Sequence, residues 1–333
     1  MKLSSTPGLL PSREVIVLGA GFSKAVAAEL PITDELGAEA TRLAKVPRSR
    51  LPRRAFNGGT FETWLSRLAE DQPYLSAAEN LHNRGIFSDV TAALVEVLRT
   101  REQSVFARDA PPWLFEFLSV AHHRGATLIT LNYDTVVEVA VASYGHWLEA
   151  LRRRVTPDDI LGDLPPRGWP GQGAGFESVR RPIQMIGMFS GVQHQPAPHG
   201  STFRLLKLHG SLDWYWSPGD SSGATLRRTT VQSRFGAPRD DWEQRDREAP
   251  GLEPFIVPPT ATKSAYYTNP ITRWAWSHAA QAMHEAERIS LVGYSFPQTD
   301  LVMSGMVADA ARSRRVAFEI VNQDPLPPKG HLQ

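Results

Sequence analysis

The chain has 333 residues, of which 41% are hydrophobic, so it is long and apolar enough to bury a substantial core. Its 36 basic and 35 acidic residues nearly cancel, which excludes a strong overall attraction to nucleic acid or to an anionic membrane and leaves only local polyanion binding open. It has no cysteine, which excludes disulfides, thiolate nucleophiles and cysteine-based metal sites. The sequence shows no signal-peptide core and no membrane-spanning apolar run, so we expect a cytoplasmic protein.

The first part of the chain predicts one strand followed by several helices. Residues 14–18 form a short apolar run that ends in a glycine-rich turn, which is typical of a buried strand. Helical spacing then predicts a helix at 34–45, and a basic loop rich in proline and glycine occupies 46–60. Three further helical patterns follow, at 61–70, 86–100 and 112–123. Together these patterns indicate a helical insertion over residues 44–112.

The rest of the chain alternates strand and helix patterns. Five strand-like segments follow, at 126–132, 203–210, 253–259, 288–295 and 316–322. Helical patterns separate several of them, at 135–151, 270–286 and 300–313. This alternation is typical of a parallel sheet with helical crossovers. We therefore expect one α/β domain over residues 1–333, Rossmann-like and doubly wound, with loop-rich insertions at 152–200 and 218–252.

The first candidate site is the turn from Gly19 to Lys24. Glycines allow backbone amides to approach phosphate oxygens, and the start of the following helix adds partial positive charge. A dinucleotide dehydrogenase would carry a third glycine where Lys24 stands, and no acidic ribose ligand follows a second strand about 20 residues on, so the sequence argues against a dehydrogenase. The alternative is a tight strand-to-helix turn that binds no ligand.

Polar residues directly follow two more predicted strands. Asn132 and Asp134 come after the strand at 126–132, where a parallel sheet binds its ligands, although either side chain would also serve as a helix cap. His209 follows the strand at 203–210 and has the chemistry of a general base, although a lone histidine is often structural. The histidines show no metal-ligand spacing, so we expect no metal.

Two later motifs complete the set. Gly293, Tyr294 and Ser295 follow the strand at 288–295, with Asp300 at the start of the next helix, and offer groups for a ribose or phosphate. Considered singly they also suit an ordinary loop with Asp300 as the helix cap. The last motif, 322–324, could reach adenosine hydroxyls or form a surface turn. Five such motifs after strands of one sheet indicate a single crevice for an extended nucleotide.

At these positions the chain resembles the Sir2 superfamily, in particular its prokaryotic branch of NAD hydrolases in antiphage defence. The motifs are GAGFSKA (19–25), TLNYDT (130–135), KLHGSLDW (207–214), IVPPTATKS (256–264) and GYSFPQTD (293–300). The resemblance implies a glycine turn that holds the NAD diphosphate, and catalytic roles for Asn132 and His209, with Asp134 tuning the histidine or holding a ribose hydroxyl. The expected NAD-binding residues are Gly19, Ala20, Gly21, Phe22, Ser23, Thr33, Thr130, Gly293, Tyr294, Ser295, Asp300, Asn322 and Asp324.

Two departures separate the chain from the sirtuin deacylases. It lacks the cysteines of their zinc ribbon, and it reads Leu30-Pro31-Ile32-Thr33-Asp34-Glu35 where they carry an Asp-Phe-Arg segment. These departures argue against deacylation and leave hydrolysis of NAD to nicotinamide and ADP-ribose as the leading hypothesis. The alternatives are a non-catalytic NAD- or ADP-ribose-binding regulatory subunit and an ADP-ribosyltransferase. Because constant activity would deplete NAD, we expect activation by homo-oligomerisation or by a separately encoded partner, either an ATPase or translocase or an Argonaute-like protein.

Overall fold

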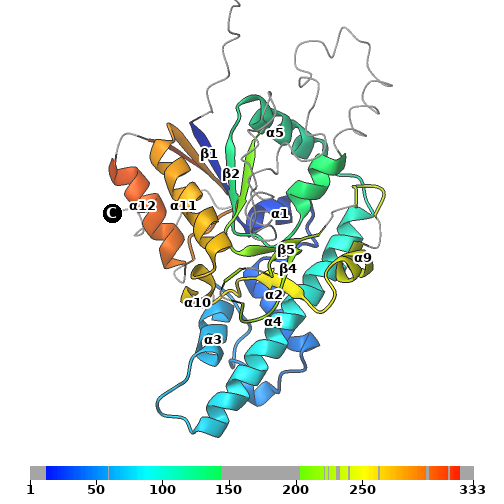
Figure 1. The fold of residues 1–333 in the computed structure, drawn as a ribbon, viewed down its shortest axis with the longest axis vertical. Coiled ribbons are helices and arrows are strands. Elements are labelled where there is room, and N and C mark those ends of the chain that lie inside the picture. The colour runs from blue at the N-terminus through cyan, green and yellow to red at the C-terminus, as the bar shows by residue number, and fades with distance from the viewer. Residues whose placement is uncertain are drawn as a thin grey trace, which may run out of the picture.

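A computed structural model describes residues 13–58, 60–143, 203–220, 222–223, 225–229, 233–238, 241–261, 263–297, 300–313 and 316–322. Its centre is a five-stranded, all-parallel sheet in the order β3-β2-β1-β7-β8 (Figure 1). The strands are β1 (Glu14–Leu18), β2 (Thr127–Thr130), β3 (Arg204–Lys207), β7 (Arg288–Val292) and β8 (Ala317–Val321). The predicted Rossmann-like α/β fold is confirmed. The order of the strands reverses between β1 and β7, and parallel sheets bind ligands at such a reversal.

Helices cover both faces of the sheet, because β1 and β2 are apolar on both sides. Val15 and Val17 of β1 pack in one core cluster with α11 (Pro270–Glu285) and α12 (Leu301–Ser313). The intervening Ile16 and Leu18 pack in another with α1 (Ala20–Val26) and α5 (Pro112–His123). Alternate residues of a strand point to opposite faces, so a continuous apolar run is buried on both sides. This explains why these strands were visible in the sequence.

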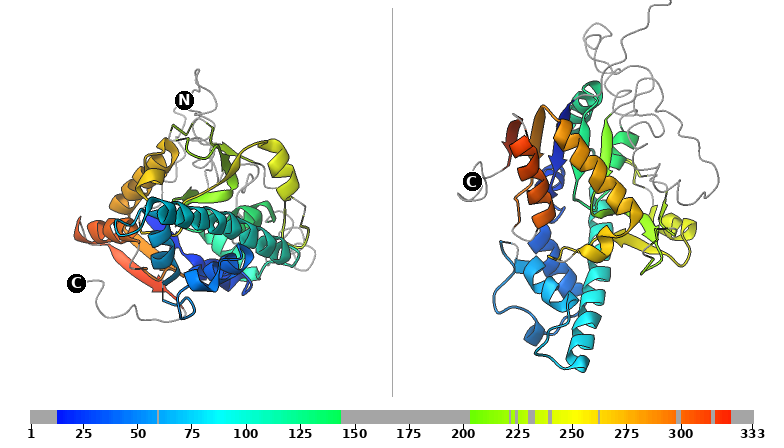
Figure 2. Two further views of the ribbon diagram at one scale, coloured as in Figure 1. Left: turned by 90° about the horizontal axis from the view of Figure 1, so that it is seen from below. Right: turned by 60° about the vertical axis from the view of Figure 1, so that its left-hand side comes forward.

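A helical arm extends beyond the carboxyl end of the sheet (Figures 1 and 2). It consists of α2 (Thr33–Leu43), the short 3-10 helix η1 (Arg48–Arg50), α3 (Thr60–Ala69) and α4 (Ala77–Phe106). A third core cluster holds the arm together, and within it Phe61 of α3 fills the space above Gly37 of α2. The start of α4 is fixed by Ser76, whose hydroxyl accepts from the amide of Glu79 while the Glu79 carboxylate accepts from the amide of Ser76.

A small antiparallel sheet corrects part of the prediction. The strand expected at 253–259 as part of the parallel alternation is β6 (Glu253–Ile256), and it pairs antiparallel with β4 (Gly210–Trp216). β4 was not predicted, because it follows β3 without an intervening loop. The stretch 218–252, expected to be loop-rich, contains β5 (Arg227–Arg228) and α9 (Asp241–Glu248), whose charged sequence hides the helix.

Two sequence predictions extend beyond the described residues. The helix expected at 135–151 is described only at 136–143, and the insertion at 152–200 lies outside the described residues. The short helix α10 (Ser264–Tyr267) precedes α11. None of the helices in the described part of the chain combines the length and apolarity needed to cross a bilayer.

The contact between α2 and α3 gives a stability test. A Cβ atom at Gly37 would lie 2.2 Å from Cγ of Phe61, whereas one at Gly85 of α4 would meet nothing within 4 Å. We expect Gly37→Ala to destabilise the protein by about 1–3 kcal/mol through overpacking. We expect Gly85→Ala, the matched control, to stabilise it by about 0.5–1 kcal/mol through helix propensity. Urea unfolding of both variants checks this, and equal stabilisation by the two substitutions would contradict the packing.

Candidate functional site

The five parallel strands end in one row. In the strand registers Leu18 of β1 lies beside Thr130 of β2 and Val292 of β7, Thr130 lies beside Lys207, and Val292 lies beside Val321. The five candidate motifs that were predicted to follow strands begin at Gly19, Asn132, His209, Gly293 and Asn322, each within two residues of this row. Ala20, Asn132, His209 and Tyr294 all lie two residues beyond it. The predicted common edge for the motifs is therefore present in the fold.

The glycine turn is packed tightly against the end of β7. The amide of Gly19 donates to the carbonyl of Val292 at 3.0 Å, and that of Gly21 donates to the carbonyl of Gly293 at 2.9 Å. A Cβ atom at Gly19 would lie 2.5 Å from the oxygen of Gly293. Gly293 itself has a φ of 63°, and a Cβ atom there would lie 2.1 Å from the nitrogen of Phe22. Strand-to-helix packing thus accounts for these glycines, and their role toward a diphosphate stays a prediction.

Ser23, Asn132 and Asp134 form one hydrogen-bonded group across the ends of β1 and β2. The Asn132 amide donates to Ser23 Oγ at 2.8 Å and to the carbonyl of Gly19 at 2.9 Å. Ser23 Oγ donates to Asp134 Oδ2 at 2.7 Å, and Asp134 Oδ1 accepts from the amide of Val136 at 3.2 Å. Asp134 therefore acts as a helix cap and also supports the group. Asn132 Oδ1 accepts no hydrogen bond from the described residues.

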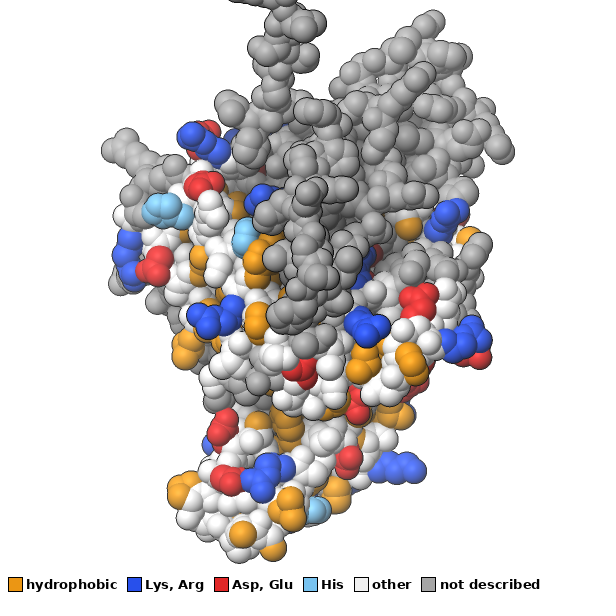
Figure 3. Space-filling model, viewed as in Figure 1, with side chains coloured by type: hydrophobic (Ala, Val, Ile, Leu, Met, Phe, Trp, Pro, Cys, Tyr) orange, Lys and Arg blue, Asp and Glu red, His pale blue; other side chains and the backbone are white. Residues whose placement is uncertain are grey.

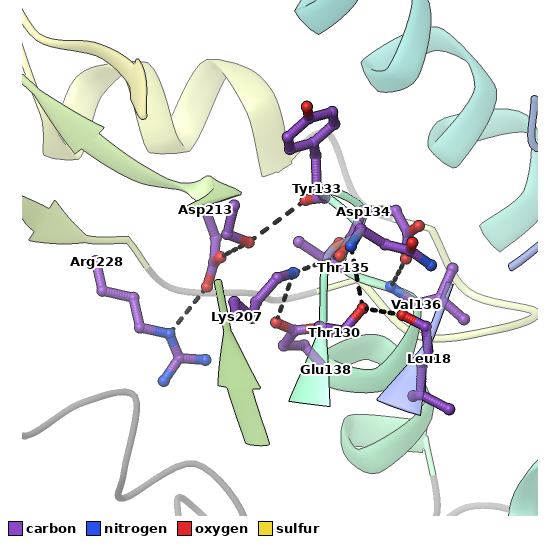
Figure 4. A network of polar contacts seen from close by, with 12 residues as sticks. Leu18, Thr130, Tyr133, Asp134, Thr135, Val136, Glu138, Lys207, Asp213 and Arg228 are labelled. Carbon is purple, nitrogen blue, oxygen red and sulfur yellow. Dashed lines mark hydrogen bonds and ion pairs between the residues drawn. The ribbon is translucent and has the colours of Figure 1, made fainter. Parts of the chain in front are cut away.

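Thr130 positions Asn132. Its hydroxyl donates to the carbonyl of Leu18 at 3.2 Å and accepts from the amide of Asn132 at 3.1 Å. The hydroxyl therefore both donates and accepts a hydrogen bond, and the bond to Leu18 ties the end of β2 to the end of β1. Figure 4 shows this link beside the Asp134 loop.

His209 lies buried at the end of β3. The residue is 5% exposed, and its Nε2 atom has no hydrogen-bond partner among the residues that the structure describes. Burial, and secondarily the positive charge of Lys263, lowers the pKa of the imidazole well below its usual value. The ring is therefore neutral at physiological pH, which is the form that accepts a proton. Gly210, with a φ of 80°, lets the chain turn directly into β4.

A group of charged and aromatic residues adjoins His209. We call this group the acidic chamber, and it consists of Glu62 of α3, Lys263, Tyr267, Trp276, Tyr294 and Asp300. Asp300 accepts from the Tyr294 hydroxyl at 2.9 Å, and its other oxygen lies 3.8 Å from Lys263 Nζ. Burial raises the pKa of Glu62 to about 7; Lys263 opposes this rise, and the charges of Asp300 and Asp34 add to it. Carboxyl groups whose pKa lies near 7 are typical of functional sites.

Sequence reasoning missed Glu62 and Lys263. Glu62 lies in a helix of the predicted insertion, beside Phe61 and three residues before Leu65, so it reads as the polar edge of an amphipathic helix. Lys263 stands inside the motif at 256–264, and that motif was the only available signal for it. Neither residue follows a strand of the parallel sheet. Tertiary packing alone brings them to the edge.

Buried polar atoms without hydrogen-bond partners gather at this edge. Within the described residues they include Glu62 Oε2, His209 Nε2, Tyr267 OH, Trp276 Nε1 and Asp300 Oδ1. The rings of His209 and Tyr267 lie 6.1 and 5.4 Å from that of Trp276. Buried polar groups are normally paired, and each unpaired one costs about 1–3 kcal/mol. A polar ligand bound here would supply the partners that these atoms lack among the described residues.

A network of buried charges supports the Asp134 loop from below (Figure 4). Lys207 Nζ donates to the carbonyl of Asp134 and to Glu138 Oε1, the latter at 3.0 Å, with both side chains at most 3% exposed. Asp213 pairs with Arg228 at 2.9 Å nearby. Lys207 and Asp213 lie in the motif at 207–214 but had been given no role. Lys207 holds the backbone at Asp134 directly, whereas Asp213 accepts from the Ser211 hydroxyl, which lies 3.5 Å from the carbonyl of Tyr133.

The remaining predicted residues are less central. Thr33 is the first residue of α2 and is half-buried, and Phe22 is buried in the core. Ser295 and Asn322 are exposed, and Asp324 lies outside the described residues. The part of the chain that the structure describes contains no cluster of three or more histidine or acidic side chains that could hold a metal ion.

Glu102 of α4 gives a pH-dependent prediction. It accepts from the amide and hydroxyl of Thr135, and burial raises its pKa from the ordinary 4.5 to about 8. Between these values the unfolded carboxyl is ionised and the folded one protonated, so stability falls by up to about 1.4 kcal/mol per pH unit as pH rises. Glu102→Gln mimics the protonated acid and removes this loss.

We expect Glu102→Gln to match the wild type at pH 5 and to exceed its stability by about 1–3 kcal/mol at pH 8, measured by urea unfolding. The control is Glu96→Gln, which changes an exposed carboxyl of the same helix. A Glu102→Gln protein that is less stable than the wild type at pH 8 would show instead that Glu102 is ionised and paired with a cation.

Comparisons with known proteins do not identify a relative. No protein-family model matches the chain, and no curated protein sequence matches it either. The row of strand ends, the Ser23–Asn132–Asp134 group and the acidic chamber are therefore the observations from which a function has to be inferred.

Proposed function

We propose that this protein hydrolyses NAD at the bond between nicotinamide and ribose. The observation that carries the proposal is the set of buried, unpartnered polar atoms at the carboxyl edge of a parallel sheet whose strand order reverses there. The resemblance of the motifs at 19–25, 130–135 and 207–214 to Sir2-like NAD hydrolases of antiphage defence agrees with the same substrate.

The acidic chamber suits the cationic end of NAD. Two buried carboxyl groups, Glu62 and Asp300, lie near a single lysine, Lys263, so the chamber favours a positively charged ligand. Trp276 and Tyr267 add aromatic faces on which a pyridinium ring can stack. A bound pyridinium would also favour the ionised form of Glu62, whose pKa of about 7 leaves it close to balance at neutral pH.

The chemistry requires little more than positioning and a base. Nicotinamide leaves with the electron pair of the broken carbon–nitrogen bond and becomes neutral, so its departure needs no acid. The ribose carbon passes through an oxocarbenium-like state and forms a bond to a water oxygen. Asn132 Oδ1 orients the ribose or the water, and His209 Nε2 accepts the proton that water loses. The products are nicotinamide and ADP-ribose.

Two substitutions test these roles. We expect His209→Ala to lower the rate of nicotinamide release by about 10²- to 10⁴-fold, the usual effect of removing a general base. We expect Asn132→Ala to lower it by about 10²-fold or more through lost positioning. The control is His284→Ala, which removes an exposed histidine of α11 and should leave the rate unchanged.

The assay follows free nicotinamide by chromatography, with circular dichroism to show that each variant is folded. Wild-type rates in folded His209→Ala and Asn132→Ala proteins would contradict the assignment. Tight NAD binding by the wild type without nicotinamide release would favour a regulatory subunit, and transfer of ADP-ribose to added proteins would favour a transferase.

An NAD hydrolase must be restrained in the cell, and we propose that assembly provides the restraint. The active form would be a homo-oligomer, or a complex with a separately encoded partner such as an ATPase, a translocase or an Argonaute-like protein. Size-exclusion chromatography coupled to the nicotinamide assay tests this: activity should follow a larger species. A monomer with full activity would contradict the proposal.

A further inference from the structure

A cavity of about 470 Å³ lies in the helical arm, and none of the residues assigned to NAD lines it. Its lining comes from one continuous part of the chain, the end of α2 and the segment up to Phe56. This segment includes the basic loop at 46–60, which the proposed function does not use. Five cationic side chains line the cavity: Arg42, Lys45, Arg48, Arg53 and Arg54.

The positive charge of this cavity is not neutralised by the residues that the structure describes. No acidic residue lines it, and none of its five cations forms an ion pair with a described residue. The acidic residue nearest in sequence, Glu39, is bound to Arg101 through hydrogen bonds of 2.7 and 3.2 Å. Like charges held around one concavity repel each other, and an anion placed among them relieves the repulsion.

Lys45 occupies an unfavourable backbone conformation at the rim. Its φ is 53°, in the left-handed region that favours glycine. It follows the C-terminal end of α2, where the amide of Val46 donates to the carbonyl of Thr41 at 3.0 Å and the amide of Lys45 donates to that of Arg42 at 3.2 Å. Glycine is the usual residue at this point of such a helix end. A lysine here sacrifices stability and supplies a cation to the cavity.

Apolar residues form the other part of the lining. Leu51, Pro52 and Phe56 line the cavity together with the cations. Phe56 packs against Phe61 and Trp64 with ring centroids 5.2 and 5.6 Å apart, and Trp64 Nε1 donates to the carbonyl of Arg50 at 2.9 Å. These contacts tie the loop to α3, so the cavity is held open without a ligand.

We propose that this cavity binds a small molecule that carries two or more phosphate groups next to a planar ring, as a nucleoside di- or triphosphate does. One arginine side chain can donate two parallel hydrogen bonds to two oxygens of a phosphate group. Five cations can therefore bind the several anionic oxygens of a di- or triphosphate. The apolar surface suits a base, and the volume is within the range of small-molecule sites. A nucleic-acid strand would need a longer basic track, whereas on the face in Figure 3 the Lys and Arg side chains are interspersed with Asp and Glu.

Isothermal titration calorimetry with ATP, orthophosphate and a 20-nucleotide single-stranded DNA tests the site, using the full chain in 150 mM salt. We expect ATP to bind more tightly than orthophosphate, and Arg48→Glu and Arg53→Glu each to weaken ATP binding by at least tenfold. Arg67→Glu, an exposed arginine of the same arm that does not line the cavity, should have no effect.

Lys45→Gly separates ligand binding from folding. We expect it to raise the unfolding temperature by about 1–3 °C, because glycine adopts the required conformation without strain, and to weaken ATP binding at least threefold. A stabilised Lys45→Gly protein with unchanged ATP affinity overturns the proposal. So does ATP binding that survives Arg48→Glu and Arg53→Glu, or DNA binding tighter than ATP binding. None of these outcomes depends on whether the protein cleaves NAD.

Discussion

The contact between the first glycine turn and the end of β7 fixes the start of α1 at the carboxyl edge of the sheet. Gly19 and Gly21 press their backbone against Gly293, and their amides bond to carbonyls at the end of β7. In a typical dinucleotide fold the second glycine of such a turn lets the backbone approach the pyrophosphate. Here these two amides already donate to the carbonyls of Val292 and Gly293, so we expect side chains beyond β2, β3 and β7 to contribute to recognition, while the role of the turn toward a diphosphate stays a prediction.

The side chains on those flanks are held in place by the charges buried beneath them. Lys207 bonds both to Glu138 and to the backbone at Asp134, which fixes the loop that carries Asn132. A buried ion pair of this kind adds little net stability, because desolvation offsets the attraction, but removing one partner leaves a costly isolated charge. The ion pair between Lys207 and Glu138 instead fixes the position of the Asp134 loop. The acidic chamber contains two carboxyl groups and one lysine. A cationic ligand would balance the charge of the second carboxyl group.

The fold was largely predictable, for a specific physical reason. β1, β2 and β7 are buried, and β1 and β2 pack on both faces, so these strands appear as short apolar runs, and each ends at a polar or glycine-rich motif at the same row. The sequence pattern did not reveal β4, because the chain turns at Gly210 straight from β3 into β4. It did not reveal α9, because the sequence of this helix is almost wholly polar. Part of the site was also predictable, since Asn132, Asp134 and His209 directly follow strands. Glu62 and Lys263 were not, because distant segments bring them to the edge. The roles of Gly19 and Gly21 depended on Gly293, more than 270 residues away in sequence, a partner that local spacing does not reveal.

The proposed function requires that the nicotinamide end of NAD bind at the atoms of the acidic chamber that lack partners among the described residues. The most direct measurement is a crystal structure of the protein with a non-hydrolysable carbocyclic NAD. We expect the pyridinium ring to lie beside Trp276 and near Glu62, with the ribose within hydrogen-bond distance of Asn132. A chamber filled with ordered water that bonds to Glu62, His209 and Asp300, with the dinucleotide bound elsewhere or not at all, would contradict it.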